Sequence, residues 1–420
     1  MKEKREIVGQ WWLPSTADQP WVGSLVLEPS KGPRLRVTVP KAYFSLSKEE
    51  TPPILHGRNE CGIPNTLLFP GRPRSQGAAA LSQLDFSVGY AVLGVEFPNR
   101  ESFLVHSLAI KMQHLYEWGG ITGFTNEHQN PFESIHVHYK QPDEQSFVIN
   151  SDLSLELQSP FSFKNNLSEK NLRESLSIWF NSNQGLAFSK CQELIDALRS
   201  MLHFAILSPV YPLQINARIK DYGHTFENKF IAHDIEIWSS IIREPVESEF
   251  FPDRWVFQFK DVQSDFGIFF SKWMDLAQKY REPLECYFTT IYHPLPHSVE
   301  HLCLTQAFEA YHGIKFGSHK QQDFKGKVQE LTETYKEHLN GLVDDAEEFA
   351  TTVTHNRNHY THYNPKWKQE GRVVEGAKLY RLNEKLRLIF QMCVLSDMGI
   401  SAQRFVRLRR QLADHIVEYV

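Results

Sequence analysis

The segment HNRNHYTH, from His355 to His362, gathers an arginine, two amides and several imidazoles within two helical turns, just before Pro365. A proline disfavours helical geometry at the residue before it, so the segment is predicted to end a helix. Arginine is a permanently charged, forked donor that suits a phosphate, and histidine exchanges a proton near neutral pH. These are the side chains needed for acid–base chemistry at a phosphodiester.

The arginine-to-histidine spacing of Arg357 and His362 is not selective by itself. Similar spacings occur at Arg100 with His106, at Arg218 with His224 and at Arg410 with His415. The first is predicted to lie on a strand or its edge, the second crosses a turn, and the third lies on a basic helix face. Only Arg357 has an amide and further imidazoles beside it. A polar helix end, with basic groups near the negative end of the helix dipole, is the alternative interpretation.

Helical periodicity dominates from Phe266 onward, where apolar residues recur at spacings of three and four. We expect an all-helical bundle from residue 262 to 420. Gly399 is a suitable residue to end the penultimate helix, and Ser401 to cap the last one. The further helices are expected at about 298–313, 322–340, 342–363, 376–398 and 401–418.

The first half of the chain has short apolar runs broken by Pro, Gly and Asn, as at 21–27 and 34–39, which predict strands of a sheet or sandwich. An amphipathic helix is expected at 189–207, followed by a strand at 212–219. A Pro- and acid-containing connection lies near 245–262. The predicted fold class is α+β, with a β-rich domain at 1–250 and a helical bundle at 262–420.

Two sets of motifs resemble one known family. The run from Arg357 to His362 resembles the signature of HEPN ribonucleases, and the flanking segments 299–312 and 379–399 resemble helices of the HEPN domains of ApeA-like anti-phage proteins. In the first half, short motifs resemble the opening strands of the ApeA N-terminal domain: GQWWLP at 9–14, GSL at 23–25, ILHG at 54–57 and TLL at 66–68.

This resemblance implies a metal-independent endoribonuclease of an abortive-infection system, in which the N-terminal domain senses a phage protein. It implies catalytic roles for Arg357, Asn358 and His362, with His359 and Glu309 as supporting residues. No cofactor or metal is expected. RNA, with tRNA as a candidate, is the expected substrate, and a homodimer the expected assembly.

The helix geometry gives a separate reason to expect a dimer. Five helical positions turn the side-chain direction by about 500°, so Arg357 and His362 lie about 140° apart, whereas Asn358 and His362 share a face. Cleavage through the 2′-hydroxyl needs both a base and an acid. A twofold dimer would bring a second copy of both residues to one cleft.

Composition favours a soluble, cytoplasmic protein. The chain has 420 residues and a net charge of −5, with no run long and apolar enough for a signal peptide or a membrane span. Its five scattered cysteines suit reduced thiols rather than disulfides. Residues 328–350 carry seven acids against one base, whereas residues 357–410 carry twelve bases against four acids, a balance of +8. The basic region is a candidate phosphate-attracting surface; pairing of acid-rich with base-rich helices is the alternative.

Two other functions stay open from the sequence. The chain could be a non-catalytic module that binds a protein or sugar through its β-rich half and dimerises through its helices. It could also be the HEPN partner of a nucleotidyltransferase, although the chain itself contains no transferase motif. Loss of RNA cleavage on His362→Ala, with folding and dimerisation intact, distinguishes the nuclease from both.

Overall fold

The structure is a computed structural model, and its chain separates into two compact units. A β-rich unit comprises Met1–Arg199, Val210–Glu249 and Gln263–Gly267, and a helical unit comprises Ser200–Pro209, Phe250–Val262 and Ile268–Val420. The residues that the structure describes are 4–40, 53–78, 81–130, 134–165, 170–227, 229–244, 255–317, 322–339, 343–363 and 365–400.

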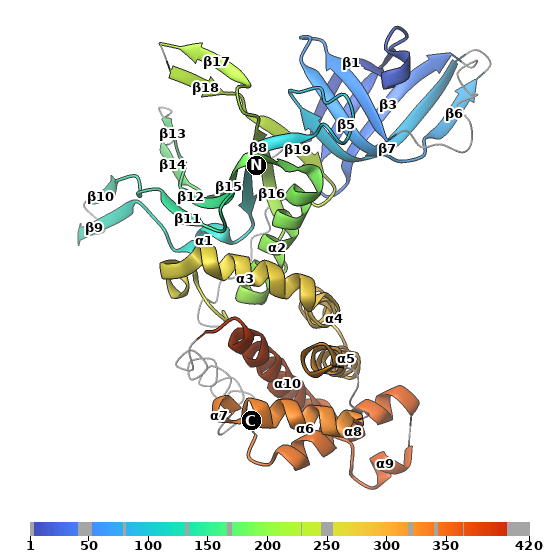
Figure 1. The fold of residues 1–420 in the computed structure, drawn as a ribbon, viewed down its shortest axis with the longest axis vertical. Coiled ribbons are helices and arrows are strands. Elements are labelled where there is room, and N and C mark those ends of the chain that lie inside the picture. The colour runs from blue at the N-terminus through green and yellow to red at the C-terminus, as the bar shows by residue number, and fades with distance from the viewer. Residues whose placement is uncertain are drawn as a thin grey trace. The chain divides into compact units, whose positions relative to one another are not determined.

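A closed six-stranded barrel forms one part of the β-rich unit (Figure 1). Its strands are β1 (Arg5–Trp12), β2 (Trp21–Glu28), β3 (Gly32–Pro40), β4 (Ile54–Asn59), β5 (Pro64–Pro70) and β7 (Leu81–Leu93). All neighbours in the order β7-β3-β2-β1-β4-β5 are antiparallel, and an additional pairing of β5 with β7 closes the ring. Closure removes the free edges that an open sheet would present.

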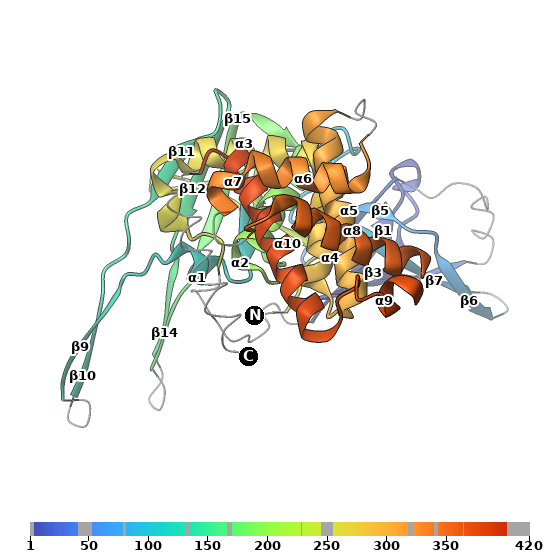
Figure 2. The same ribbon diagram turned by 90° about the horizontal axis from the view of Figure 1, so that it is seen from below.

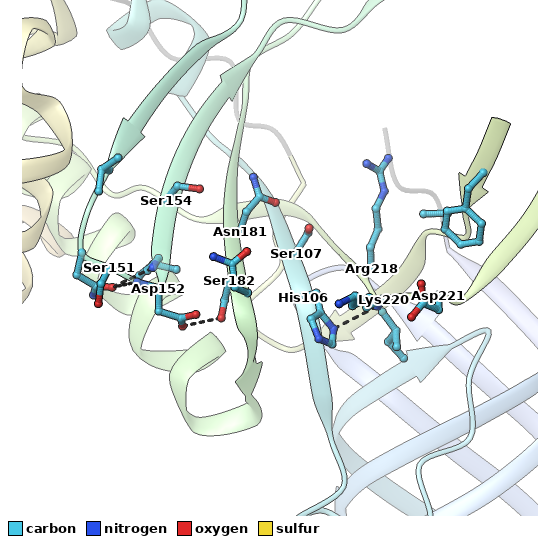
Figure 3. A pocket seen from close by; sticks show the side chains of 17 residues that line it. His106, Ser107, Ser151, Asp152, Ser154, Asn181, Ser182, Arg218, Lys220 and Asp221 are labelled. Carbon is cyan, nitrogen blue, oxygen red and sulfur yellow. Dashed lines mark hydrogen bonds between the residues drawn. The ribbon is translucent and has the colours of Figure 1, made fainter.

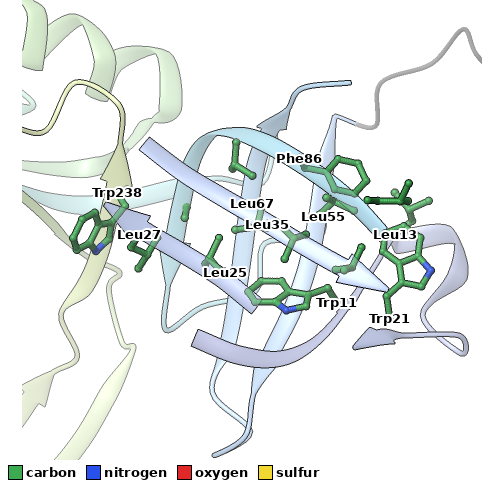
Figure 4. Packing of buried hydrophobic residues seen from close by; sticks show 14 of the residues in the cluster. Trp11, Leu13, Trp21, Leu25, Leu27, Leu35, Leu55, Leu67, Phe86 and Trp238 are labelled. Carbon is green, nitrogen blue, oxygen red and sulfur yellow. The ribbon is translucent and has the colours of Figure 1, made fainter. Parts of the chain in front are cut away.

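Alternate residues along the barrel strands point inward and form a continuous apolar core (Figure 4). Trp11, Leu25 and Leu35 are fully buried there, and Trp21 stacks on Phe86 with ring centroids 6.3 Å apart. The apolar runs noted at 21–27 and 34–39 are thus two neighbouring barrel strands.

The sheet continues beyond the barrel from β7 through β19 (Ile235–Ser239), β16 (Pro212–Arg218), β8 (Leu104–Met112), β15 (Ser177–Ala187), β12 (Leu153–Gln158) and β11 (Gln145–Val148). Helix α1 (Leu115–Gly119) and the part of α2 (Phe188–Ile206) that ends at Arg199 belong to the same unit, and β6 (Arg74–Ala78) pairs with β7. Three separate two-stranded sheets are formed by β9 (Phe124–Asn130) with β10 (Ser134–Tyr139), β13 (Phe161–Asn165) with β14 (Lys170–Glu174), and β17 (Gly223–Phe226) with β18 (Lys229–Ala232). The predicted β-rich N-terminal half is confirmed, as a barrel with outside strands.

The described part of the second half is helical, as predicted. It contains α3 (Phe266–Lys279), α4 (Arg281–Tyr292), α5 (His297–Phe316), α6 (Phe324–Thr334), α7 (Lys336–Leu339), α8 (Ala346–His362), α9 (Pro365–Gln369) and α10 (Gly376–Asp397). The helix expected at 322–340 is divided into α6 and α7, and neither α4 nor α9 was expected. The helix expected at 401–418, with its cap at Ser401 and the pair Arg410 and His415, lies outside the described residues.

Helix α10 crosses the helical unit, with its residues from Leu388 to Leu395 buried. The ring of Phe390 stacks on Tyr287 of α4, 4.9 Å between centroids, and meets Tyr311 of α5 edge-on. The helix ends where the sequence predicts, because Gly399 takes a left-handed φ of 76° and Ile400 N–H donates to the Leu395 carbonyl. Every helix in the described ranges is too short or too polar to cross a lipid bilayer.

Candidate functional site

Helix α8 carries the segment from His355 to His362 and has defined ends. The Asp345 carboxylate accepts hydrogen bonds from the backbone N–H groups of Glu347 and Glu348, at 2.8 and 3.0 Å, and so caps the first turn. The α-helix continues to His362, and Tyr363 then turns to a left-handed φ of 46°. Its neighbours include α5 and α6 (Figure 2).

Arg357 is held on three sides. Its Nη2 donates to Glu309 Oε2 of α5 at 3.1 Å, and its Nη1 donates to Asn358 Oδ1 at 3.3 Å. Its guanidinium carbon lies 5.1 Å from the centre of the Phe324 ring. Lys327 donates to the other Glu309 oxygen at 2.8 Å, so one carboxylate bridges two cations. The Arg357 side chain remains 29% exposed, which leaves part of its donor fork accessible.

The candidate residues fall into two groups around α8. Because the helix is regular through His362, Asn358 and His362 share a face, and Arg357 lies about 140° from His362. His362 is exposed at the last turn of the helix, while Asn358 is half-buried. The structure thus brings together Glu309, Arg357 and Asn358, and leaves His362 facing solvent.

The other two histidines of the segment are packed against aromatic rings. His359 is 4% exposed and lies against Tyr360 and Tyr363, with centroids 5.1 and 5.8 Å apart. The ring of His355 lies beside that of Trp367 in α9, with centroids 5.1 Å apart. Burial lowers the pKa of His355, and the positive charges of Arg372 and Lys325 lower it further.

Asn356 is a structural residue of the segment that the sequence did not single out. Its side chain is fully buried; Nδ2 donates to the Thr352 carbonyl at 2.8 Å, and Oδ1 accepts from Val374 N–H at 3.1 Å. Tyr360 Oη donates to the Val374 carbonyl at 3.3 Å. Helix α8 is thereby fastened to the chain that leads into α10.

A buried polar network fastens the same face of α8, where the ring of His301 also lies 6.3 Å from that of Tyr360. His301 of α5 is fully buried, with Nδ1 2.9 Å from Asn383 Oδ1 and Nε2 3.3 Å from the Val353 carbonyl of α8. Asn383 Nδ2 donates to Glu300 Oε2 at 3.2 Å, and Arg387 pairs with Glu300. Burial lowers the pKa of His301, although the hydrogen bonds to Asn383 and to the Val353 carbonyl act in the opposite direction and raise it.

These supporting residues do leave a signal in the sequence. His301 precedes Leu304 and Phe308 at helical spacing, and Asn383 lies among Leu379 and Leu386 in the same way. A polar residue within an apolar stripe must find buried partners, because an unpaired polar group costs about 1–3 kcal/mol. The pattern can indicate that a buried polar network exists, but it cannot show which residues form it.

Among the described residues, no group of three or more His, Cys, Asp or Glu side chains is arranged to hold a metal ion. The basic region shows local ion pairs, for example Arg387 with Glu384, Lys368 with Glu375 at 2.7 Å and Arg372 with Glu370 at 2.8 Å. In these three pairs the acid comes from the basic region itself, so the pairs are already counted in the balance of +8 and leave that surplus unchanged.

Two family models match the chain. The model described as ApeA N-terminal domain 1 matches residues 6–273, which is more than half of the chain, and the model described as Apea-like HEPN matches residues 302–404. The second match contains Glu309, Asn356, Arg357 and His362. No curated protein and no solved structure matches the chain. The resemblance seen in the sequence motifs is confirmed.

The environment of His355 gives a testable pH behaviour. We expect an NMR titration to give this imidazole a pKa below the usual value of about 6.5, and Arg372→Gln to move it upward. An unfolded His355 takes up its proton at higher pH than the folded one. The stability that the neutral His355 ring contributes to the fold is therefore fully present above about pH 6.5 and is lost as the pH falls below that value.

Disappearance of the assigned resonance in His355→Gln identifies the titrating signal. A His355 pKa at or above 6.5, or one that Arg372→Gln leaves in place, contradicts this account of its surroundings.

Proposed function

Because the chain belongs to the ApeA family, with an ApeA N-terminal domain 1 followed by an Apea-like HEPN domain, we propose that it is a metal-independent endoribonuclease of an anti-phage abortive-infection system. The membership supports a HEPN-type anti-phage effector, and at family level a HEPN domain implies ribonuclease activity. The observation that carries the finer proposal is the placement of Arg357, Asn358 and an exposed His362 on one helix.

In the proposed reaction, the ribose 2′-oxygen attacks the adjacent phosphorus and the 5′-oxygen leaves. One histidine removes the proton of the 2′-hydroxyl, and another protonates the leaving oxygen. The products are a 2′,3′-cyclic phosphate and a 5′-hydroxyl. His362 is the proposed proton carrier because it is the exposed imidazole at the end of α8.

Arg357 has the proposed task of stabilising negative charge on the phosphate. Glu309 holds one side of its guanidinium, which fixes the direction of the remaining donors. Asn358 accepts from the same guanidinium and shares a face with His362, so it is placed to orient either the phosphate or the imidazole. His359, whose ring is buried, is assigned a supporting role.

The need for two histidines points to a homodimer with a composite site. One copy of α8 offers one exposed imidazole from the predicted set, and it lies about 140° from Arg357 around the helix. A twofold axis near the ends of two α8 helices would supply both acid and base, together with two arginines. HEPN domains generally dimerise and bind RNA, which agrees with this arrangement.

A nuclease that attacks cellular RNA, with tRNA as a candidate, has to be restrained until infection. We assign the sensing of a phage protein to the domain at 1–250 and RNA cleavage to the domain at 262–420. The proposed place of action is the cytoplasm.

Replacement of the proton carrier tests the proposal directly. His362→Ala should lower RNA cleavage by about 10²–10⁴-fold, because general acid–base catalysis is lost, while folding and oligomeric state stay unchanged. His355→Gln on the same helix is the matched control and should retain activity. Sequencing of RNA ends after controlled expression measures both. Equal cleavage by wild type and His362→Ala would leave the non-catalytic binding module as the better explanation.

Metal independence has its own test. Cleavage by the purified protein should persist in excess EDTA, because the 2′-hydroxyl is the nucleophile and side chains supply the proton transfers and the positive charge. The measurement is the initial rate with and without chelator at constant ionic strength. Strong inhibition that added Mg²⁺, Mn²⁺ or Zn²⁺ reverses would refute this part of the proposal.

Heterodimers test the composite site. Two differently tagged chains, one wild type and one carrying both Arg357→Ala and His362→Ala, are co-expressed and isolated through both tags. A composite site predicts that the heterodimer is nearly inactive, whereas independent sites predict about half of the activity of a wild-type dimer. A doubly tagged wild-type dimer is the control. Half-activity in the heterodimer would exclude a shared site.

A further inference from the structure

Polar side chains cross four adjacent strands of the β-rich unit in a single row. The strand register pairs Ser154 of β12 with Asn181 of β15, Asn181 with Ser107 of β8, and Ser107 with Arg218 of β16. Paired residues on neighbouring strands point to the same face of a sheet. Figure 3 shows the four side chains next to one another on that face.

This row lies in a cleft of about 610 Å³, which is within the range of about 300–1,000 Å³ found for ligand sites. The four side chains are half-buried. Two strongly exposed apolar residues, Val148 (70% exposed) and Phe230 (48%), also line the cleft. Its other polar lining residues include His106, Asp152, Ser182, Lys220 and Asp221.

Residues at the edges of the cleft form hydrogen bonds with other residues of the same unit. Asp152 accepts from Ser182 Oγ at 2.7 Å and from Gln184 N–H at 2.9 Å, and the Ser182 bond in particular lowers the pKa of Asp152. The backbone N–H of Lys220 donates to His106 Nδ1 at 3.2 Å. These bonds fix the shape of the cleft without using the row itself.

The row keeps its own hydrogen-bonding capacity. Within the described part of the chain, the side chains of Ser154, Asn181 and Ser107 form no hydrogen bond with the protein. Arg218 donates through Nε to Asp234 at 2.6 Å, and its guanidinium carbon lies 4.1 Å from the centre of the Trp179 ring. The donors and acceptors of Ser154, Asn181 and Ser107 are therefore available to a ligand, in exchange for water.

Charge and shape restrict the kind of ligand. The cations Arg218 and Lys220 are offset by Asp152, Asp221 and Asp234, which disfavours a polyanion such as an RNA strand. The indole of Trp179 is covered by Arg218, so its face is not open for stacking by a sugar or a base. Hydroxyl and amide side chains both donate and accept, as peptide groups do.

We propose that this cleft binds an extended polypeptide segment whose peptide groups and polar side chains pair with Ser154, Asn181 and Ser107. Three inter-strand steps span about 14 Å, which an extended chain covers with four or five residues. The Asp152 end suits a basic or amide side chain, and Val148 and Phe230 offer contacts for apolar ones. This deepens the proposed sensing of a phage protein and rests on it for its biological meaning.

The test uses the full chain in a His362→Ala background, so that nuclease activity cannot affect expression. A random library of 12-residue displayed peptides is selected on this protein, and enriched peptides are synthesised and titrated against variants. Ser107→Leu places an apolar side chain in the middle of the row, and Asn181→Ala is a milder change. The matched control is Ser24→Leu, a half-buried serine on barrel strand β2 outside the cleft.

The expected result is enrichment of peptides whose affinity falls about tenfold or more in Ser107→Leu and Asn181→Ala, and stays unchanged in Ser24→Leu. Thermal unfolding of each variant shows whether the β-rich unit is intact. The proposal fails if no peptide is enriched, or if Ser107→Leu and Ser24→Leu bind the peptides equally.

A 12-nucleotide single-stranded RNA is titrated in parallel, and RNA binding that Ser107→Leu abolishes would overturn the assignment of a peptide ligand. Because binding is read out in a chain without the proposed proton carrier, its failure is distinguishable from failure of the nuclease. An active nuclease without peptide binding rejects the cleft alone. Peptide binding without RNA cleavage in wild type rejects the nuclease alone.

Discussion

The unbroken α-helix from Ala346 to His362 is the constraint on which the proposed chemistry depends. A helix that loosened before Pro365 could turn Arg357 and His362 toward one phosphate within a single chain. The regular helix keeps them about 140° apart, so one copy of the segment offers charge stabilisation and proton transfer in different directions. The argument for a shared site between two chains follows from this geometry, together with the chemical need for an acid and a base.

The ion pair of Arg357 with Glu309 acts in two ways. It orients the guanidinium, because a carboxylate that accepts from Nη2 fixes the plane of the remaining donors. It also offsets part of the positive charge that a phosphate would feel, although Lys327 shares the same carboxylate. Beneath this pair, Asn356 and His301 fasten α8 through buried hydrogen bonds, so the segment rests on a fixed base while His362 stays exposed.

Sequence periodicity predicted most described helices of the second half and the end of α10 at Gly399, because both depend on local patterns. It missed α4, whose Pro283 reads as a helix breaker but lies in the first turn, where proline is tolerated. Barrel closure between β5 and β7 could not be predicted, since strand pairing depends on distant parts of the chain. The partners of His301 could not be predicted for the same reason, because Val353 and Asn383 lie far from it along the chain.

Two sets of polar side chains, one in each unit, differ in whether they bond within the protein, and this contrast separates support from function. In the helical unit, His301, Asn383 and Glu300 are buried and bonded to one another, as structural polar groups must be. In the β-rich unit, Asn181 and Ser107 are half-buried in a cleft whose edges are bonded while they themselves are not. A fixed cleft with unused donors and acceptors is prepared for a ligand, because binding there costs little reorganisation. The same reasoning applies to His362, which is exposed at the end of a helix whose other polar groups are fastened.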